Sequence, residues 1–203
     1  MKRITGFFLL IMLIALASSS AAVQDQNQIL RSDSGQNISE KNLTFVNSVG
    51  AFGIKGFNLA EMVRFKTPNP EFTVNKIAVL GYDGYNGTEE SVPTEGLISL
   101  EIRDKDLNLL YKLADSQIPY FNYISNSTLP VWAYFEVPSV TVADEFFVCF
   151  YDRGMVNVGA EMGNSTNNSF LLDQKTRTVF SADIKNKENQ TVPLNWQIIA
   201  SGK

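Results

Sequence analysis

The sequence predicts an all-β protein, a two-sheet antiparallel β-sandwich of jelly-roll-like form. Short runs in which apolar and polar residues alternate recur along the chain, and turn-forming residues separate them. One run, Asp144 to Arg153, has apolar side chains at both parities, which indicates a central strand buried on both faces. No amphipathic pattern of about ten or more residues predicts a helix. Two packed sheets bury such strands best.

We expect about ten strands at the spacing that is typical of sandwiches. The prolines at 68 and 70 end the first of them, and residues 105–108 predict a hairpin turn between two others. Residues 45–57, interrupted by glycines, are expected to form an irregular edge of the domain. The expected strands cover residues 60–65, 72–82, 97–104, 109–113, 131–137, 144–153, 155–162, 169–173, 178–182 and 194–201.

The first 22 residues have the pattern of a secretory signal peptide. Lys2 and Arg3 precede the apolar run from Phe7 to Ala17, and a segment of small residues follows, so we expect cleavage before Val23. The apolar run is shorter than the ~20 residues that a bilayer core requires. We therefore expect a secreted or cell-surface protein outside the cytoplasm. An uncleaved signal anchor is the alternative, and it is the one expected route to a membrane.

Composition and charge limit the partners and the domain plan. The formal net charge is −4, and loss of Lys2 and Arg3 with the signal peptide would change it to −6. An acidic surface argues against nucleic acid and anionic membranes as partners. The single cysteine, Cys149, excludes an internal disulfide and is expected to be a small core residue. Residues 23–44 are polar enough to predict a flexible linker, and residues 45–203 are expected to form one sandwich domain.

Several strand and turn segments together resemble a known kind of domain. They are Arg64 to Pro68, Val79 to Tyr85, Glu101 to Asp104, Phe146 to Tyr151 and Asn195 to Ala200. These segments are similar to a secreted β-sandwich domain of archaeal cell-surface proteins, over about residues 60–202. The resemblance implies a non-catalytic accessory module, of uncharacterised function, that often accompanies peptidase or other extracellular modules. No functional residues of that family carry over to this chain.

Seven Asn-x-Ser/Thr sequons suit N-glycosylation of an exported chain. Roughly two or three such sequons would arise by chance from a composition of this kind. The alternative is that Asn, Ser and Thr cluster because all three favour turns. We expect the sequons to be glycan acceptors where the host has the machinery. The asparagines are Asn37, Asn42, Asn86, Asn126, Asn164, Asn167 and Asn189.

Only weak signals for a metal occur in the sequence. Asp83, Glu89 and Glu90 supply carboxylate oxygens in a glycine-containing turn region, where they could hold a structural Ca²⁺. Their spacing follows no calcium-loop pattern. Residues 104–108 begin like a calcium loop but lack its glycine and its later glutamate, so a hairpin turn is favoured. We expect no cofactor, with a structural Ca²⁺ as the open alternative.

The absence of histidine restricts catalysis most strongly. Ser-His-Asp triads, Cys-His pairs and His-ligated zinc are excluded, and no serine is followed three residues later by lysine. A pair of carboxylates, as in glycosidases, stays open, with Glu101, Asp104, Asp152 and Glu161 as candidates. We expect a protein that is not an enzyme.

An aromatic cluster is the candidate binding site. Trp132 and Tyr134 share one face of the strand predicted at 131–137, and Tyr120 and Tyr123 come shortly before it. Exposed together, these four rings would form a platform for a sugar or a protein. The alternative is that Tyr120, Phe121 and Tyr123 fold over Trp132 as a satellite core.

We expect an exported, non-catalytic domain that acts in cell-surface binding or structure, with a cell-surface protein or a glycan as its partner. A carbohydrate-binding module is the first alternative. A glycosidase-type enzyme that uses two carboxylates is the second.

Overall fold

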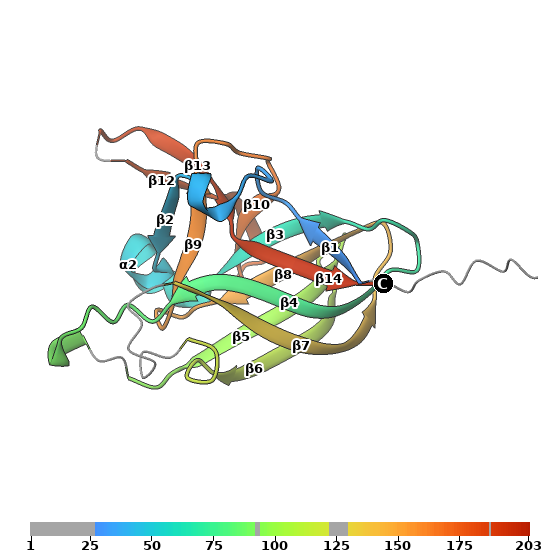
Figure 1. Ribbon diagram of the computed structural model, residues 1–203, viewed down its shortest axis with the longest axis horizontal. Helices are drawn as coiled ribbons and strands as arrows, with labels where there is room; N and C mark the ends of the chain where they lie inside the picture. The colour runs from blue at the N-terminus through green and yellow to red at the C-terminus, as the bar shows by residue number, and fades with distance from the viewer. Residues whose placement is uncertain (1–26, 92–93, 122–129, 187) are drawn as a thin grey trace, which may run out of the picture.

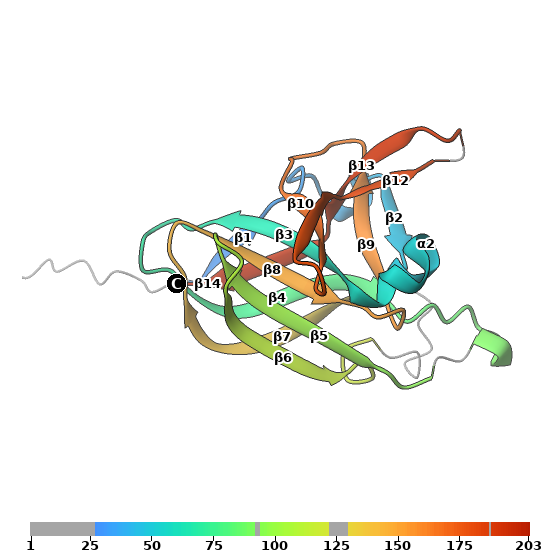
Figure 2. The same ribbon diagram turned by 180° about the vertical axis from the view of Figure 1, so that it is seen from behind.

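The protein is a sandwich of two antiparallel sheets, so the predicted all-β fold class is confirmed. The computed structural model describes residues 27–91, 94–121, 130–186 and 188–203. Figure 1 shows the molecule with the larger sheet toward the viewer, and Figure 2 shows the smaller sheet from the opposite side. The two inner faces enclose the main hydrophobic core.

The larger sheet has eight strands. They are β1 (Gln28–Arg31), β2 (Leu43–Val46), β4 (Thr73–Tyr82), β7 (Val131–Thr141), β9 (Asn157–Met162), β12 (Asp183–Lys185), β13 (Thr191–Trp196) and β14 (Ile198–Gly202). Their order is β1-β14-β4-β9-β13-β12, while β7 pairs with β4 and β2 pairs with β9. The strand expected over 194–201 is thus divided at Gln197 between β13 and β14.

The smaller sheet has six strands in the order β11-β10-β3-β8-β5-β6. They are β3 (Leu59–Lys66), β5 (Leu97–Asp104), β6 (Leu109–Ser116), β8 (Glu145–Tyr151), β10 (Ser169–Asp173) and β11 (Thr178–Ser181). The predicted hairpin turn joins β5 to β6, where the backbone N–H of Asp104 donates to the carbonyl of Asn108 at 3.0 Å. The predicted strands agree with the observed ones to within a few residues.

Strand β8 is central and buried on both faces, as its sequence predicts. Phe146, Val148 and Phe150 face the core between the sheets. Cys149 and Tyr151 face the other way and pack in a second buried cluster. All five side chains are fully buried, because β3 and β5 flank β8 and large neighbours cover its outer face. Each of them contributes roughly 1.5–3 kcal/mol of hydrophobic stabilisation before entropy is subtracted.

Helices are few and short. They are η1 (Ile38–Glu40), α2 (Ser48–Phe52), η2 (Gly53–Asn58) and η3 (Glu89–Ser91). Asn47 caps α2, since its side-chain oxygen accepts the N–H of Gly50 at 2.9 Å. The segment expected to form an irregular edge, residues 45–57, therefore holds a strand end and two short helices. Among the described residues, no helix has the length and apolarity needed to cross a membrane.

The structure corrects the expectation of a flexible linker over residues 23–44. From Gln28 onward this segment belongs to the larger sheet, because β1 pairs with β14 and β2 pairs with β9. Both strands are only four residues long and lie among polar residues, which concealed them in the sequence. The sandwich therefore includes residues from Gln28, and not only those from Phe45. Residues 23–26 and the predicted signal peptide lie outside the described residues.

A buried ammonium group attaches this N-terminal segment to the sheet. Lys41 Nζ lies 2.7 Å from Asp33 Oδ2, 2.8 Å from Gln197 Oε1 and 3.7 Å from Glu161 Oε2. The side chains of Lys41 and Glu161 are fully buried. Burial alone would raise the pKa of Asp33, but hydrogen bonds from Lys41 and Arg31 hold it below its usual range. This Lys41 cluster fixes η1 beside the outer face of the larger sheet.

Replacing Lys41 with methionine removes the charge and keeps the length of the side chain. Because Asp33 and Glu161 would then lack their buried cation, we expect a loss of about 3–5 kcal/mol in the free energy of unfolding. The matched control is Lys76→Met, which breaks the exposed ion pair with Glu136 and the contact of Lys76 with the Tyr134 ring, and which should cost less than about 1 kcal/mol. Urea unfolding measures both variants, and equal losses would contradict the anchoring role of Lys41.

Candidate functional site

Strand pairing builds a hollowed outer face on the larger sheet. Trp132 and Tyr134 face outward on β7, because the residues that alternate with them are turned toward the core. Ala78 on β4 lies opposite Tyr134, Ile199 on β14 lies opposite Ala78, and Arg31 on β1 lies opposite Ile199. A small side chain thus stands between larger ones, which leaves a depression beside the Tyr134 ring.

This outer groove has a volume of about 340 Å³. Asn37 and η1 form a wall of the groove. The Tyr134 side chain is 59% exposed and Trp132 is half-buried. Lys76 Nζ lies 5.9 Å from the centre of the Tyr134 ring. The groove is lined by Ile29, Arg31, Asn37, Ile38, Lys76, Ala78, Trp132, Tyr134, Ile199 and Ser201.

The chemistry of the outer groove suits a polar ligand that has apolar faces. Residues two apart on a strand lie about 7 Å apart, so the rings of Trp132 and Tyr134 can contact neighbouring parts of one ligand. Lys76 is paired with Glu136 at 2.8 Å, and Arg31 is paired with Asp33 at 2.9 Å. Because carboxylates balance both cations, the groove favours a neutral or weakly charged ligand over a polyanion. Its volume lies at the lower end of the roughly 300–1,000 Å³ common for small-molecule sites.

Tyr120 lies on the opposite side of β7 from Trp132. Its ring stacks on Phe135 with 4.3 Å between centroids, and its hydroxyl donates to Asp115 at 3.0 Å. Phe121 is buried in the main core. The expected platform that joins Tyr120 to Trp132 is therefore wrong, and so is the alternative in which Tyr120 and Phe121 cover Trp132. Of the predicted binding residues, Trp132 and Tyr134 come together, and Tyr123 lies outside the described residues.

The three carboxylates considered for calcium are not gathered into one cluster of side chains in the described residues. Asp83 Oδ1 accepts the backbone N–H of Tyr85 at 3.0 Å, whereas Glu89 and Glu90 are exposed on η3. In the part of the chain that the structure describes, no group of three or more His, Cys, Asp or Glu side chains is placed to hold a metal ion. The turn is closed instead by Asn86, whose Oδ1 accepts hydrogen bonds from its own loop.

All six described sequon asparagines are exposed, which is the steric condition for a glycan acceptor. Asn126 lies outside the described residues. One of the six, Asn37, also lines the outer groove.

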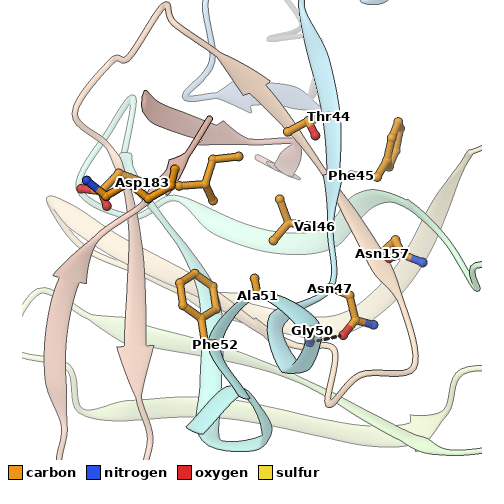
Figure 3. A pocket seen from close by; sticks show the side chains of 11 residues that line it. Thr44, Phe45, Val46, Asn47, Gly50, Ala51, Phe52, Asn157 and Asp183 are labelled. Carbon is orange, nitrogen blue, oxygen red and sulfur yellow. Dashed lines mark hydrogen bonds between the residues drawn. The ribbon is translucent and has the colours of Figure 1, made fainter. Parts of the chain in front are cut away.

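A second hollow lies at the end of the sandwich (Figure 3). It has a volume of about 650 Å³ and lies between β2, α2 and β12. Val46, Ala51 and Phe52 supply its apolar lining, while Asp183 and Lys185 supply its charges from β12. Phe52 and Asp183 also line an adjoining cavity of about 700 Å³ on the β11 side. The apolar lining suits a side chain of a partner better than it suits a sugar.

Glu61 and Asp152 form a buried pair of acids beneath α2. The backbone N–H of Ser48 donates to Asp152 Oδ2 at 2.9 Å, and the Ser48 hydroxyl donates to Glu61 Oε1. Glu61 Oε2 is buried without a hydrogen-bond partner among the described residues. Burial, followed by the nearby charge of Asp152, raises the pKa of Glu61 well above its usual range. Burial raises the pKa of Asp152 to about 6.

Glu101 is a buried acid of the opposite kind, because cations surround it on the outer face of the smaller sheet. It contacts Arg103 at 2.7 Å and Lys112 at 3.1 Å, and the Tyr151 hydroxyl donates to it at 3.0 Å. Burial alone would raise the pKa of Glu101, but hydrogen bonds from Arg103 and Lys112 hold it below its usual range. This carboxylate is occupied by protein donors.

The remaining acids considered for catalysis are also engaged within the protein. Asp104 accepts hydrogen bonds inside the β5–β6 turn, and Glu161 belongs to the Lys41 cluster. None of these four candidates lines any of five hollows formed by the described residues: Glu101, Asp104, Asp152 and Glu161.

No protein-family model matches this chain, and no significant match was found among curated proteins or solved structures. The resemblance to an archaeal surface domain therefore stays a prediction.

Sequence reasoning missed much of the outer groove. Lys76 and Ala78 stand at outward positions of an alternating strand, which was a usable signal for their side of the sheet. Ile29 and Asn37 lie in the expected linker and gave no such signal. Only the pairing of β1 with β14, and the Lys41 cluster, bring them beside Tyr134.

The two kinds of buried acid predict opposite pH dependence. Raised pKa values in the folded state mean that the Glu61–Asp152 pair stabilises the fold at low pH, and that this stability is lost as pH rises through about 6 for Asp152. We expect the stability of Glu61→Gln relative to the native protein to increase between about pH 4 and about pH 8. Denaturant unfolding across this range measures it.

Glu101→Gln is the matched control, because the pKa of Glu101 is lowered on folding. Its stability relative to the native protein should decrease as pH rises to about 5 and then stay level, since ionised Glu101 stabilises the fold fully above its unfolded pKa and loses that effect as pH falls through the lowered folded pKa. Parallel pH profiles for the two variants would contradict the assignment of opposite environments.

Adding a chelator tests whether the protein binds a structural metal ion. Because no group of three or more acidic or other metal-binding side chains is gathered among the described residues, we expect EDTA to shift the Tm by no more than the few degrees that about 1 kcal/mol produces in a chain of this size. Reductant should have equally little effect, because Cys149 has no disulfide partner. Differential scanning calorimetry measures both. A fall of more than about 10 °C with EDTA would reveal a bound metal ion.

Proposed function

We propose that this protein is a non-catalytic carbohydrate-binding domain that acts outside the cell, with the outer groove as its ligand site. The observation that carries the proposal is the exposure of the Tyr134 ring, 59%, beside Trp132 in a groove on a flat sheet face. Large aromatic side chains are mostly buried in soluble domains, so adjacent exposed rings usually mark a binding site.

The composition of the groove favours a sugar over other ligands. The faces of Trp132 and Tyr134 can pack on the C–H faces of a pyranose ring, while Asn37, Ser201 and Lys76 offer polar groups for its hydroxyls. The groove lies on paired strands, whose hydrogen bonds hold the rings in place. Such a site loses little conformational entropy when a ligand binds.

The signal-peptide pattern and the resemblance to a surface domain support an extracellular location. A sugar of the cell surface is then the natural ligand class. A cell-surface protein is the second candidate partner, and the hollow at the end of the sandwich, which Phe52 lines, is the feature that favours it. The glycosidase alternative has less support, because the candidate acids are buried or engaged away from the cavities.

Tyr134→Ala tests the ligand site. Because the side chain is mostly exposed, we expect it to change the free energy of unfolding by less than about 1 kcal/mol. Loss of a stacking ring should weaken binding of surface oligosaccharides by about tenfold or more, and Trp132→Ala should do the same. A glycan array followed by isothermal titration calorimetry measures the affinities.

Two control variants locate the effect. Phe135→Ala removes the buried neighbour of Tyr134 and should cost about 3–5 kcal/mol of stability. Phe180→Ala removes an exposed ring from the cavity on the β11 side, away from the outer groove, and should leave sugar affinity unchanged. If Tyr134→Ala and Trp132→Ala both retain full affinity for every bound glycan, the outer groove is not the sugar site.

A further inference from the structure

The sequon at Asn37 lies on the wall of the outer groove. Asn37 is exposed and precedes η1 in an extended conformation, with φ −63° and ψ 147°. Its side chain makes no capping hydrogen bond to that helix. It shares the lining of the groove with Trp132 and Tyr134. An acceptor amide therefore stands at the edge of the aromatic surface.

The other described sequon that lines a cavity has a different setting. Asn86 lies beside Tyr82 and Phe45, but those two rings pack against each other with 5.4 Å between centroids. The Asn86 side-chain oxygen already accepts hydrogen bonds from Thr88 and Ser91. Of these two glycan acceptors, Asn37 is the one that lines a groove together with the exposed Tyr134 ring.

The wall that carries Asn37 is held in place. The Lys41 cluster anchors the chain directly after η1, and the pairing of β1 with β14 anchors it before η1. A sugar attached to Asn37 would therefore begin at a fixed position beside Trp132 and Tyr134. A short tether gives an attached ligand an effective concentration in the mM range, which is enough to occupy a weak sugar site.

We infer that a glycan on Asn37 occupies the outer groove of its own chain and competes there with external sugars. This inference rests on the proposed function, because it uses the same rings to bind a sugar. The donor class is a lipid-linked oligosaccharide phosphate of the exporting host. The bond from Asn37 Nδ2 to C1 of the sugar forms, the bond from C1 to the phosphate oxygen breaks, and one amide proton leaves as the lipid phosphate departs.

The test compares glycosylated full-length chains from an exporting host that performs N-glycosylation. Asn37→Gln and Ser39→Ala both remove the sequon, and Ser39→Ala keeps the asparagine. The matched control is Asn42→Gln, which removes a neighbouring exposed sequon that lines no described cavity. Glycopeptide mass mapping reports whether Asn37 is occupied. Iodide quenching of fluorescence reports on Trp132, since the other tryptophan, Trp196, is buried at 1% exposure.

We expect a glycan on Asn37, and stronger quenching of Trp132 in Asn37→Gln and Ser39→Ala than in the native chain or Asn42→Gln. With an effective concentration of about 1 mM and an intrinsic Kd of about 0.1 mM, the apparent Kd of a free oligosaccharide should be about tenfold lower without the Asn37 glycan. An unmodified Asn37, or equal quenching of Trp132 with and without its glycan, overturns the inference.

The failure of the proposed function gives a different result. In one outcome, the Asn37 glycan shields Trp132 in the native chain, but Asn37→Gln binds no free oligosaccharide. The proposal that the groove binds an external sugar is then wrong, while the contact of the glycan with its own chain stands. If Asn37→Gln binds oligosaccharide and Trp132 is equally quenched in all glycosylated chains, only the contact within the chain is wrong.

Discussion

The buried ammonium of Lys41 is the contact on which the outer groove depends. It joins Asp33, before η1, to Glu161 and Gln197 of the larger sheet. An unpaired buried charge costs several kcal/mol, so these groups must stay together while the protein is folded. The result is a short segment held beside the sheet face, next to the depression that Ala78 leaves between larger side chains. The groove beside Tyr134 exists because this segment supplies its wall.

The distribution of charge separates the structural acids from the proposed binding surface. Glu101 is surrounded by cations, and Glu61 and Asp152 share a closed space beneath α2. These carboxyl groups interact with other groups of the protein, and none of them lines a described cavity. The rings of the outer face have the opposite character, because Tyr134 is mostly exposed and both rings line an open groove. Under the proposed function, an aromatic surface on paired strands would bind a ligand with little reorganisation and would need no histidine.

The parity of strands made some of the site predictable. Alternation along β7 placed Trp132 and Tyr134 on one face, and the structure has them there. The error over Tyr120 came from the loop before β7, which turns toward the core and stacks Tyr120 on Phe135. Periodicity gives the side of a strand, but it gives no information on the direction in which an irregular loop folds. The same limit applied to the carboxylates near Asp83, which share a turn region without converging.

The sequence by itself determined the all-β class, the doubly buried β8 strand and the outward parity of the β7 rings. These follow from local patterns, because side-chain direction alternates along any strand. Tertiary structure alone decided that residues 28–46 join the larger sheet, that Lys41 meets Asp33 and Glu161, and that Asn37 lies beside Tyr134. Most of those contacts join residues far apart in the chain, and strand order, which no local pattern records, determines which of them meet.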